Sequence, residues 1–171
     1  MLLNTVTDVG KGVLFFPILE RHGKRTALVY LAAMIVEVVL LDIGILCLLM
    51  ILPLSSQHGI SVGLANALGS LAVQSNTMAY QLAEMTLGVG GMFLCGLLFR
   101  TRLIPRFLAG WGVIGYAILL AGFMAEIFGL QFSLMLSIPG GLFEVVLGFW
   151  LLTKGFWTER EHERDRIPDV A

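Results

Sequence analysis

The sequence predicts an all-α fold, an integral membrane bundle of five transmembrane helices. The chain of 171 residues is 57% hydrophobic and only 13% charged, whereas soluble domains average about 25% charged residues. Its eleven Lys and Arg residues fall, apart from Lys11, into three clusters at residues 21–25, 100–106 and 154–166. Long apolar stretches without Lys or Arg separate these clusters. Since cytoplasmic loops of membrane proteins gather Lys and Arg, this pattern indicates a chain that crosses a bilayer repeatedly.

Five apolar segments are candidates for the spans, because a spanning helix needs about 20 mostly apolar residues. The first candidate is marginal, since it carries Asn4, Asp8 and Lys11 and needs neighbouring helices in order to insert. Together the segments predict a transmembrane bundle over residues 1–156, followed by a charged cytoplasmic tail over 157–171. The predicted spans lie at about residues 2–19, 27–52, 78–99, 107–128 and 133–152.

The loops predict the orientation of the bundle. Residues 20–26 and 100–106 and the tail are basic and are expected in the cytoplasm, whereas residues 53–77 and 129–132 contain no Lys or Arg and are expected outside. The N-terminus is then outside and the C-terminus cytoplasmic. Within the external loop, the uncharged stretch Gly59–Val73 is expected to form an interfacial helix or an outer extension of the third span. A sixth span there would place Arg100 outside, which the charge rule argues against.

Acidic side chains inside the apolar spans are the candidates for function. Each would cost about 2.5–3.5 kcal/mol at a helix centre, so such residues are rare unless they serve a purpose. Depth ranks them, because those near the middle of a span cannot reach water. Glu126 is almost at the external surface and is the weakest candidate. The set is Glu37, Asp42, Glu84, Glu126 and Glu144.

Lys11 is the cation at comparable depth, and Asp8, one turn before it, can pair with it locally. One hypothesis is a midplane cluster in which Lys11 meets Glu37 or Glu144 and a proton moves among them. The other is that the carboxyls are neutral and hydrogen-bond neighbouring groups to hold the helices together. The first predicts proton- or cation-coupled movement of a small solute, with Asp42 and Glu84 as further candidate groups. The second predicts a structural or regulatory membrane subunit.

Patterns of other chemistry are missing from the sequence. The three histidines fall in the predicted loops or tail, and no Ser–His–Asp set, His-Glu-x-x-His or Cys-x-x-Cys pattern is present. An enzyme, a metal site and a cofactor are therefore not expected, and no basic patch suggests nucleic acid. The expected partners are the lipid bilayer and either a second copy of the chain or a partner membrane subunit.

Two motifs resemble a bacterial family of small multi-span proteins catalogued as domain of unknown function 4386. They are Gly96–Arg106 (GLLFRTRLIPR) and Pro139–Phe156 (PGGLFEVVLGFWLLTKGF). The segment from Phe16 through Arg21 to Glu37 is similar to an earlier hairpin of that family. The resemblance implies a multi-pass protein of the bacterial cytoplasmic membrane and no particular activity. Family members usually begin with an additional apolar helix, which this chain lacks.

Overall fold

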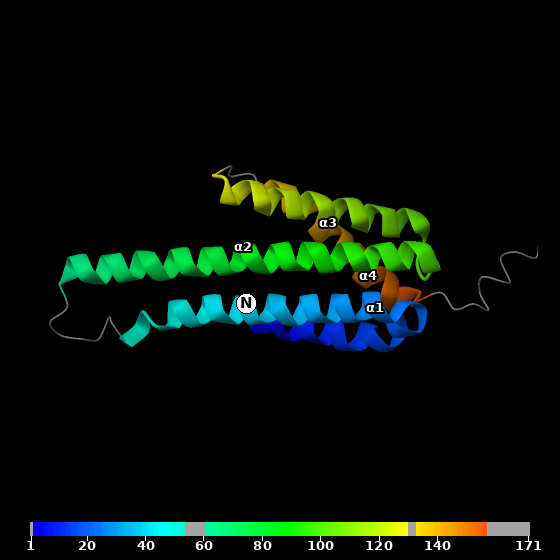
Figure 1. The fold of residues 1–171 in the computed structure, drawn as a ribbon, viewed down its shortest axis with the longest axis horizontal. Coiled ribbons are helices and arrows are strands. Elements are labelled where there is room, and N and C mark those ends of the chain that lie inside the picture. The colour runs from blue at the N-terminus through cyan, green and yellow to red at the C-terminus, as the bar shows by residue number, and fades with distance from the viewer. Residues whose placement is uncertain (1, 54–60, 130–132, 157–171) are drawn as a thin grey trace, which may run out of the picture. The chain divides into compact units, whose positions relative to one another are not determined.

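The protein is built from long helices. The computed structural model describes residues 2–53, 61–129 and 133–156, and in these ranges it contains four α-helices and no strand (Figure 1). All four are long and apolar enough to cross a membrane. The chain divides within α2 into two compact units, the first ending at Gly90 and the second beginning at Gly91. The helices are α1 (Leu2–Leu49), α2 (Val62–Thr101), α3 (Arg106–Ile127) and α4 (Ser133–Thr153).

The structure therefore has four apolar helices of spanning length where the sequence predicted five. The predicted spans at 2–19 and 27–52 both lie in α1, and the basic loop expected between them is missing. Helical contacts continue across that region, because Lys24 pairs with Glu20 at 3.2 Å, four residues away. Only Gly23 leaves the helix, with extended backbone at φ −176° and ψ 80°. The charges that suggested a loop therefore lie on helical turns.

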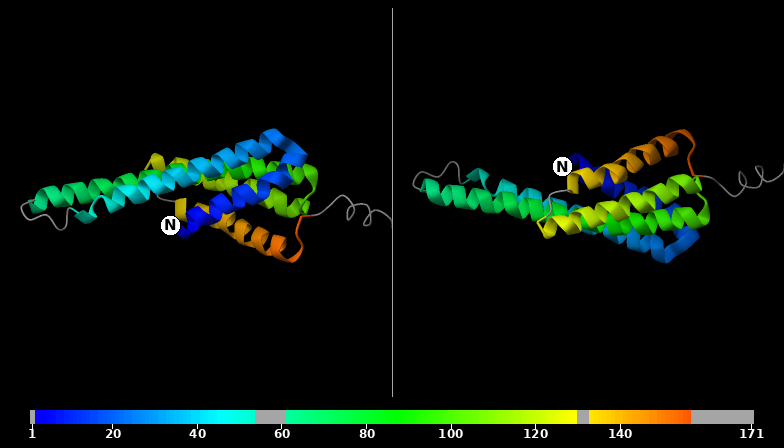
Figure 2. Two further views of the ribbon diagram at one scale, coloured as in Figure 1. Left: turned by 90° about the horizontal axis from the view of Figure 1, so that it is seen from below. Right: turned by 90° about the horizontal axis from the view of Figure 1, so that it is seen from above.

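The break at Gly23 folds α1 back on itself. We name residues 2–22 the first arm and residues 24–49 the second arm, and the two run antiparallel in every view (Figures 1 and 2). Thr5 bonds to Asp42, and the ring of Phe15 stacks on Tyr30 with centroids 6.4 Å apart. Between these contacts the arms pack closely, since a Cβ added to Gly12 would lie 3.3 Å from the Leu31 side chain. The contacts fix the register of the hairpin.

The helix α2 is continuous for 40 residues. Its part in the first unit packs against the second arm, because a Cβ on Gly44 would lie 3.2 Å from that of Ala79 and one on Gly90 would lie 2.6 Å from that of Ala33. The uncharged segment from Val62 onward is an outer extension of the helix that holds the third predicted span. It is not a separate interfacial helix. Residues 54–60, like the predicted tail at 157–171, lie outside the described residues.

In the second unit, α3 and α4 are antiparallel and approach each other at the backbone (Figure 2). A Cβ on Gly115 would lie 3.2 Å from both the Pro139 oxygen and the Gly140 Cα. One turn away, the Phe143 ring fills the space beside Gly112. Pro139 is inside α4, where the lost N–H and the following glycine leave room for the backbone of α3. Small residues at such contacts are typical of helix pairs in membranes.

Large apolar side chains cover the outside of all four helices. In the first unit Leu14 is 71% exposed, and in the second unit Phe107 is 74% and Phe149 is 67% exposed. Water would not favour so continuous an apolar surface on a soluble protein. The side chains point to lipid as the surrounding solvent.

Replacing Gly115 by Ala is expected to destabilise the second unit by about 1–3 kcal/mol, because the new methyl group meets backbone atoms that cannot rotate away. Gly110→Ala, on the same helix, is the matched control. A Cβ at Gly110 would come no closer than 4.0 Å to a neighbour outside its own helical turn, so it should be neutral or slightly stabilising. Thermal unfolding in detergent checks both, and equal melting temperatures would contradict the close packing of α3 on α4.

Candidate functional site

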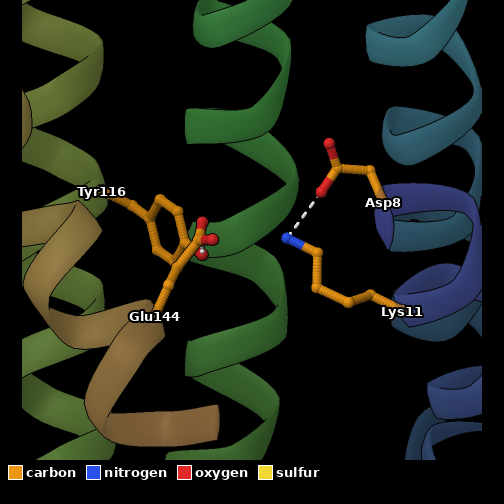
Figure 3. Close-up of polar contacts among 4 residues, drawn as sticks. All are labelled: Asp8, Lys11, Tyr116 and Glu144. Atoms are coloured by element: carbon orange, nitrogen blue, oxygen red, sulfur yellow. Dashed lines mark hydrogen bonds and ion pairs between the residues drawn. The ribbon is translucent and has the colours of Figure 1, made fainter. Parts of the chain in front are cut away.

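A buried ion pair lies in the first arm of α1. The Lys11 Nζ atom is 2.7 Å from the Asp8 Oδ1 atom, at the i,i+3 spacing of one helical turn (Figure 3). The Asp8 side chain is only 6% exposed, whereas that of Lys11 is 30% exposed. The structure confirms the predicted local pairing. Since removing one partner of a buried pair leaves an uncompensated charge, each of these residues is needed by the other.

The Glu37 carboxyl lies at the same level on the facing arm. Glu37 is 3% exposed, and with Asp8 it is one of two buried acids. The Thr5–Asp42 contact on one side and the Gly12–Met34 contact on the other bracket the position. Their register places Asp8 opposite residues 38 and 39 of the second arm, within one helical turn of Glu37. Two carboxyls and one amine therefore share one level of the hairpin.

A further carboxyl at this level comes from α2. The contacts of Gly44 with Ala79 and of Gly90 with Ala33 place Glu37 within one helical turn of Glu84, which is half-buried. We call Asp8, Lys11, Glu37 and Glu84 the polar layer. Within the described ranges, no three acidic, His or Cys side chains come together as a metal ion would require. Among the described residues, the layer is therefore not a preformed cage for a metal ion.

Asp42 lies apart from the polar layer. Its residue is exposed, and its Oδ1 accepts a hydrogen bond of 3.4 Å from the Thr5 hydroxyl. At about 1.5 Å per helical residue it lies about 28 Å from Gly23 along the second arm, against about 21 Å for Glu37. The sequence placed the two acids at similar depth. The fold-back of α1 brings only Glu37 to the level of Asp8.

Glu144 belongs to the second unit and has its own partner. The Tyr116 hydroxyl donates a hydrogen bond of 2.9 Å to the Glu144 Oε1 atom (Figure 3). The Tyr116 ring meets Phe143 edge-on with centroids 5.8 Å apart, and it occupies the space where a Cβ on Gly91 would lie. Packing thus fixes the hydroxyl that holds the carboxyl. The predicted meeting of Lys11 with Glu144 stays a prediction.

Two residues of these sites were not ranked as candidates from the sequence. Asp8 was noted only as a local partner of Lys11, because its segment is the least apolar of the predicted spans. Its spacing from Lys11 was the signal that could have raised its rank. Tyr116 carries no sequence signal for its contact, since it is 28 residues from Glu144.

The comparison with known proteins gives a family without an assigned activity. A family model described as "Domain of unknown function (DUF4386)" matches residues 1–155. No curated protein and no solved structure matches the chain. A function must therefore be argued from the chemistry of the polar groups themselves.

The contact between Tyr116 and Glu144 is expected to show in a double-mutant cycle. Tyr116→Phe and Glu144→Met each remove one side of the hydrogen bond, and their combined cost should fall short of the sum by about 1 kcal/mol. Thermal unfolding of the four proteins in one detergent measures this coupling. Strictly additive costs would mean that the hydrogen bond does not contribute.

Proposed function

This chain belongs to the family described as domain of unknown function 4386, and on that premise we propose that it is a multi-pass protein of the bacterial cytoplasmic membrane that moves protons or another cation together with a small solute. Four apolar helices of spanning length and an apolar outer surface support the membrane setting. The surrounding bilayer is accordingly its first partner.

The observation that carries the transport proposal is the polar layer. A buried ion pair between Asp8 and Lys11 lies level with the buried Glu37, among helices whose outer faces are apolar. Intramembrane ionisable groups that lie inside a bundle commonly mark ion pathways and proton relays. Three carboxyls around one amine exceed what neutralising Lys11 requires. The excess carboxyls are the groups that would take up and release the transported ion.

The orientation follows from the basic residues near the helix ends. Arg21, Lys24 and Arg25 flank the bend of α1 and are exposed, Arg100 is exposed in the last turn of α2, and Lys154 directly follows α4. We place these ends at the cytoplasmic face by the positive-inside rule. At about 1.5 Å per residue the first arm is about 31 Å long and the second about 39 Å, so either is long enough for a hydrocarbon core of about 30 Å. The N-terminus is then external.

Cysteine labelling tests this orientation. In a variant with Cys47 and Cys95 replaced by Ala, Arg25→Cys should react with a membrane-impermeant maleimide only in inside-out vesicles. Ser61→Cys, at an exposed position before α2, should react only in right-side-out vesicles. The reverse pattern would contradict the orientation, and labelling of both from one side would contradict the second arm of α1 as a crossing helix.

Infrared spectroscopy of the reconstituted protein tests the transport proposal without knowledge of the solute. Glu37→Gln is expected to remove a carboxyl band that changes between mildly acidic and mildly alkaline pH and exchanges quickly in D₂O. Glu144→Gln is the control, since this carboxyl lies outside the polar layer and bonds to Tyr116, and it should leave the pH-dependent band in place. A Glu37 band that neither titrates nor exchanges would contradict proton movement through the polar layer.

A second function is favoured by the contact between Tyr116 and Glu144. Here an intramembrane carboxyl joins two helices through a hydrogen bond. A structural or regulatory membrane subunit would use Glu84 in the same way toward a helix of a partner subunit or of a second copy. Constant carboxyl bands together with a co-purifying protein that is lost in Glu84→Gln would favour this function over transport.

A further inference from the structure

The two oxygens of the Asp8 carboxyl have different surroundings. Oδ1 lies 2.7 Å from the Lys11 amine, whereas Oδ2 is buried and has no hydrogen-bond partner among the described residues. Figure 3 shows one oxygen directed at the amine and the other turned away from it. The side chain as a whole is 6% exposed. A carboxylate in this position is only half satisfied.

The oxygen without a partner shows which protonation state of Asp8 lacks hydrogen bonds, namely the ionised carboxylate. An ionised carboxylate can accept about four hydrogen bonds, and a buried oxygen without any loses its hydration without compensation. Binding a proton removes the negative charge that needs this compensation. A proton on Oδ2 would therefore remove the charge from a carboxyl whose second oxygen has no hydrogen-bond partner.

The groups around Asp8 bear on which ion it takes. Lys11 lies on its own arm, Glu37 faces it from the second arm, Glu84 lies at the same level on α2, and Asp42 lies one turn further along the second arm. The ammonium group already occupies the position beside Oδ1 that a metal ion would need. Among the described residues, no three His, Cys, Asp or Glu side chains lie close enough together to coordinate a metal ion. A proton needs only one oxygen.

We propose that Asp8 is the proton-accepting residue of the polar layer. Protonation of Asp8 ends its ion pair with Lys11. In this step a proton from water binds the Oδ2 atom, a new O–H bond forms, and the carboxylate becomes a neutral acid. The donor is a hydronium ion, whose O–H bond breaks to leave a water molecule. The ion pair ends, and the ammonium of Lys11 keeps its charge. The polar layer gains one positive charge, which is then available to a neighbouring carboxylate. This inference rests on the proposed transport function and names the residue and the ion that it uses.

Infrared difference spectra after a pH jump test the assignment, with the full-length protein in vesicles. Asp8→Asn should lose a carboxyl band that forms at low pH in the wild type. Asp42→Asn is the matched control, since this exposed aspartate lies outside the polar layer, and it should keep that band. Asp8→Glu should keep a band at a shifted frequency, which separates loss of the carboxyl from loss of the fold. Lys11→Met should keep the band at every pH, because a buried carboxylate without its ammonium takes a proton and holds it.

The outcomes separate this inference from the function on which it rests. If Asp8→Asn keeps the band and Glu37→Gln loses it, Asp8 is not the acceptor, while proton movement through the layer stands. If no band of the wild type responds to pH, both proposals fail. Replacing choline chloride by sodium chloride at constant pH should leave the band unchanged, and a sodium-dependent loss would show that the ion is not a proton.

Discussion

The first arm of α1 can lie among apolar helices because Asp8 and Lys11 neutralise each other. Either charge alone would cost about 2.5–3.5 kcal/mol near the centre of a membrane helix. Their spacing of one turn makes the pair local, so it forms as soon as the helix does. The pair must then pack against another helix, and the second arm provides this contact after the break at Gly23. The close approach at Gly12 and the stacking of Phe15 on Tyr30 depend on the same fold-back.

The two units are held together by different physical means. In the first unit, polar contacts such as the one between Thr5 and Asp42 accompany the packing of the arms. In the second unit, glycines let the backbones of α3 and α4 come together, as at Gly115 and Gly140. The Glu144 carboxyl there is engaged by a tyrosine that its neighbours lock in place. The Glu144 carboxyl thus has a fixed donor, whereas the Asp8 carboxyl has one oxygen without a hydrogen-bond partner among the described residues.

Hydropathy predicted α3 and α4 to within about a residue at each end, because both are bounded by turns that also interrupt the apolar pattern. It failed for α1, where the charges at 20–25 were interpreted as a loop although helical turns carry them. It left Val62–Val73 open, since small uncharged residues look alike in a helix and in a loop. The level shared by Asp8 and Glu37 could not be predicted, because it depends on the register of the hairpin. Register is set by contacts such as that of Gly12 with Leu31, which leave no periodic signal in either segment.

The first arm of α1 is much shorter than α2, and this difference would make the first unit sensitive to the thickness of a membrane around it. With 40 residues, α2 is about 60 Å long, while the first arm is only about 31 Å long. A thicker bilayer covers more of α2 without meeting an ionisable group before Glu84. The first arm has no additional apolar length, since it only matches a hydrocarbon core of about 30 Å. In the proposed membrane setting, thickening of the bilayer would therefore strain the segment that carries Asp8 and Lys11 before it strains α2.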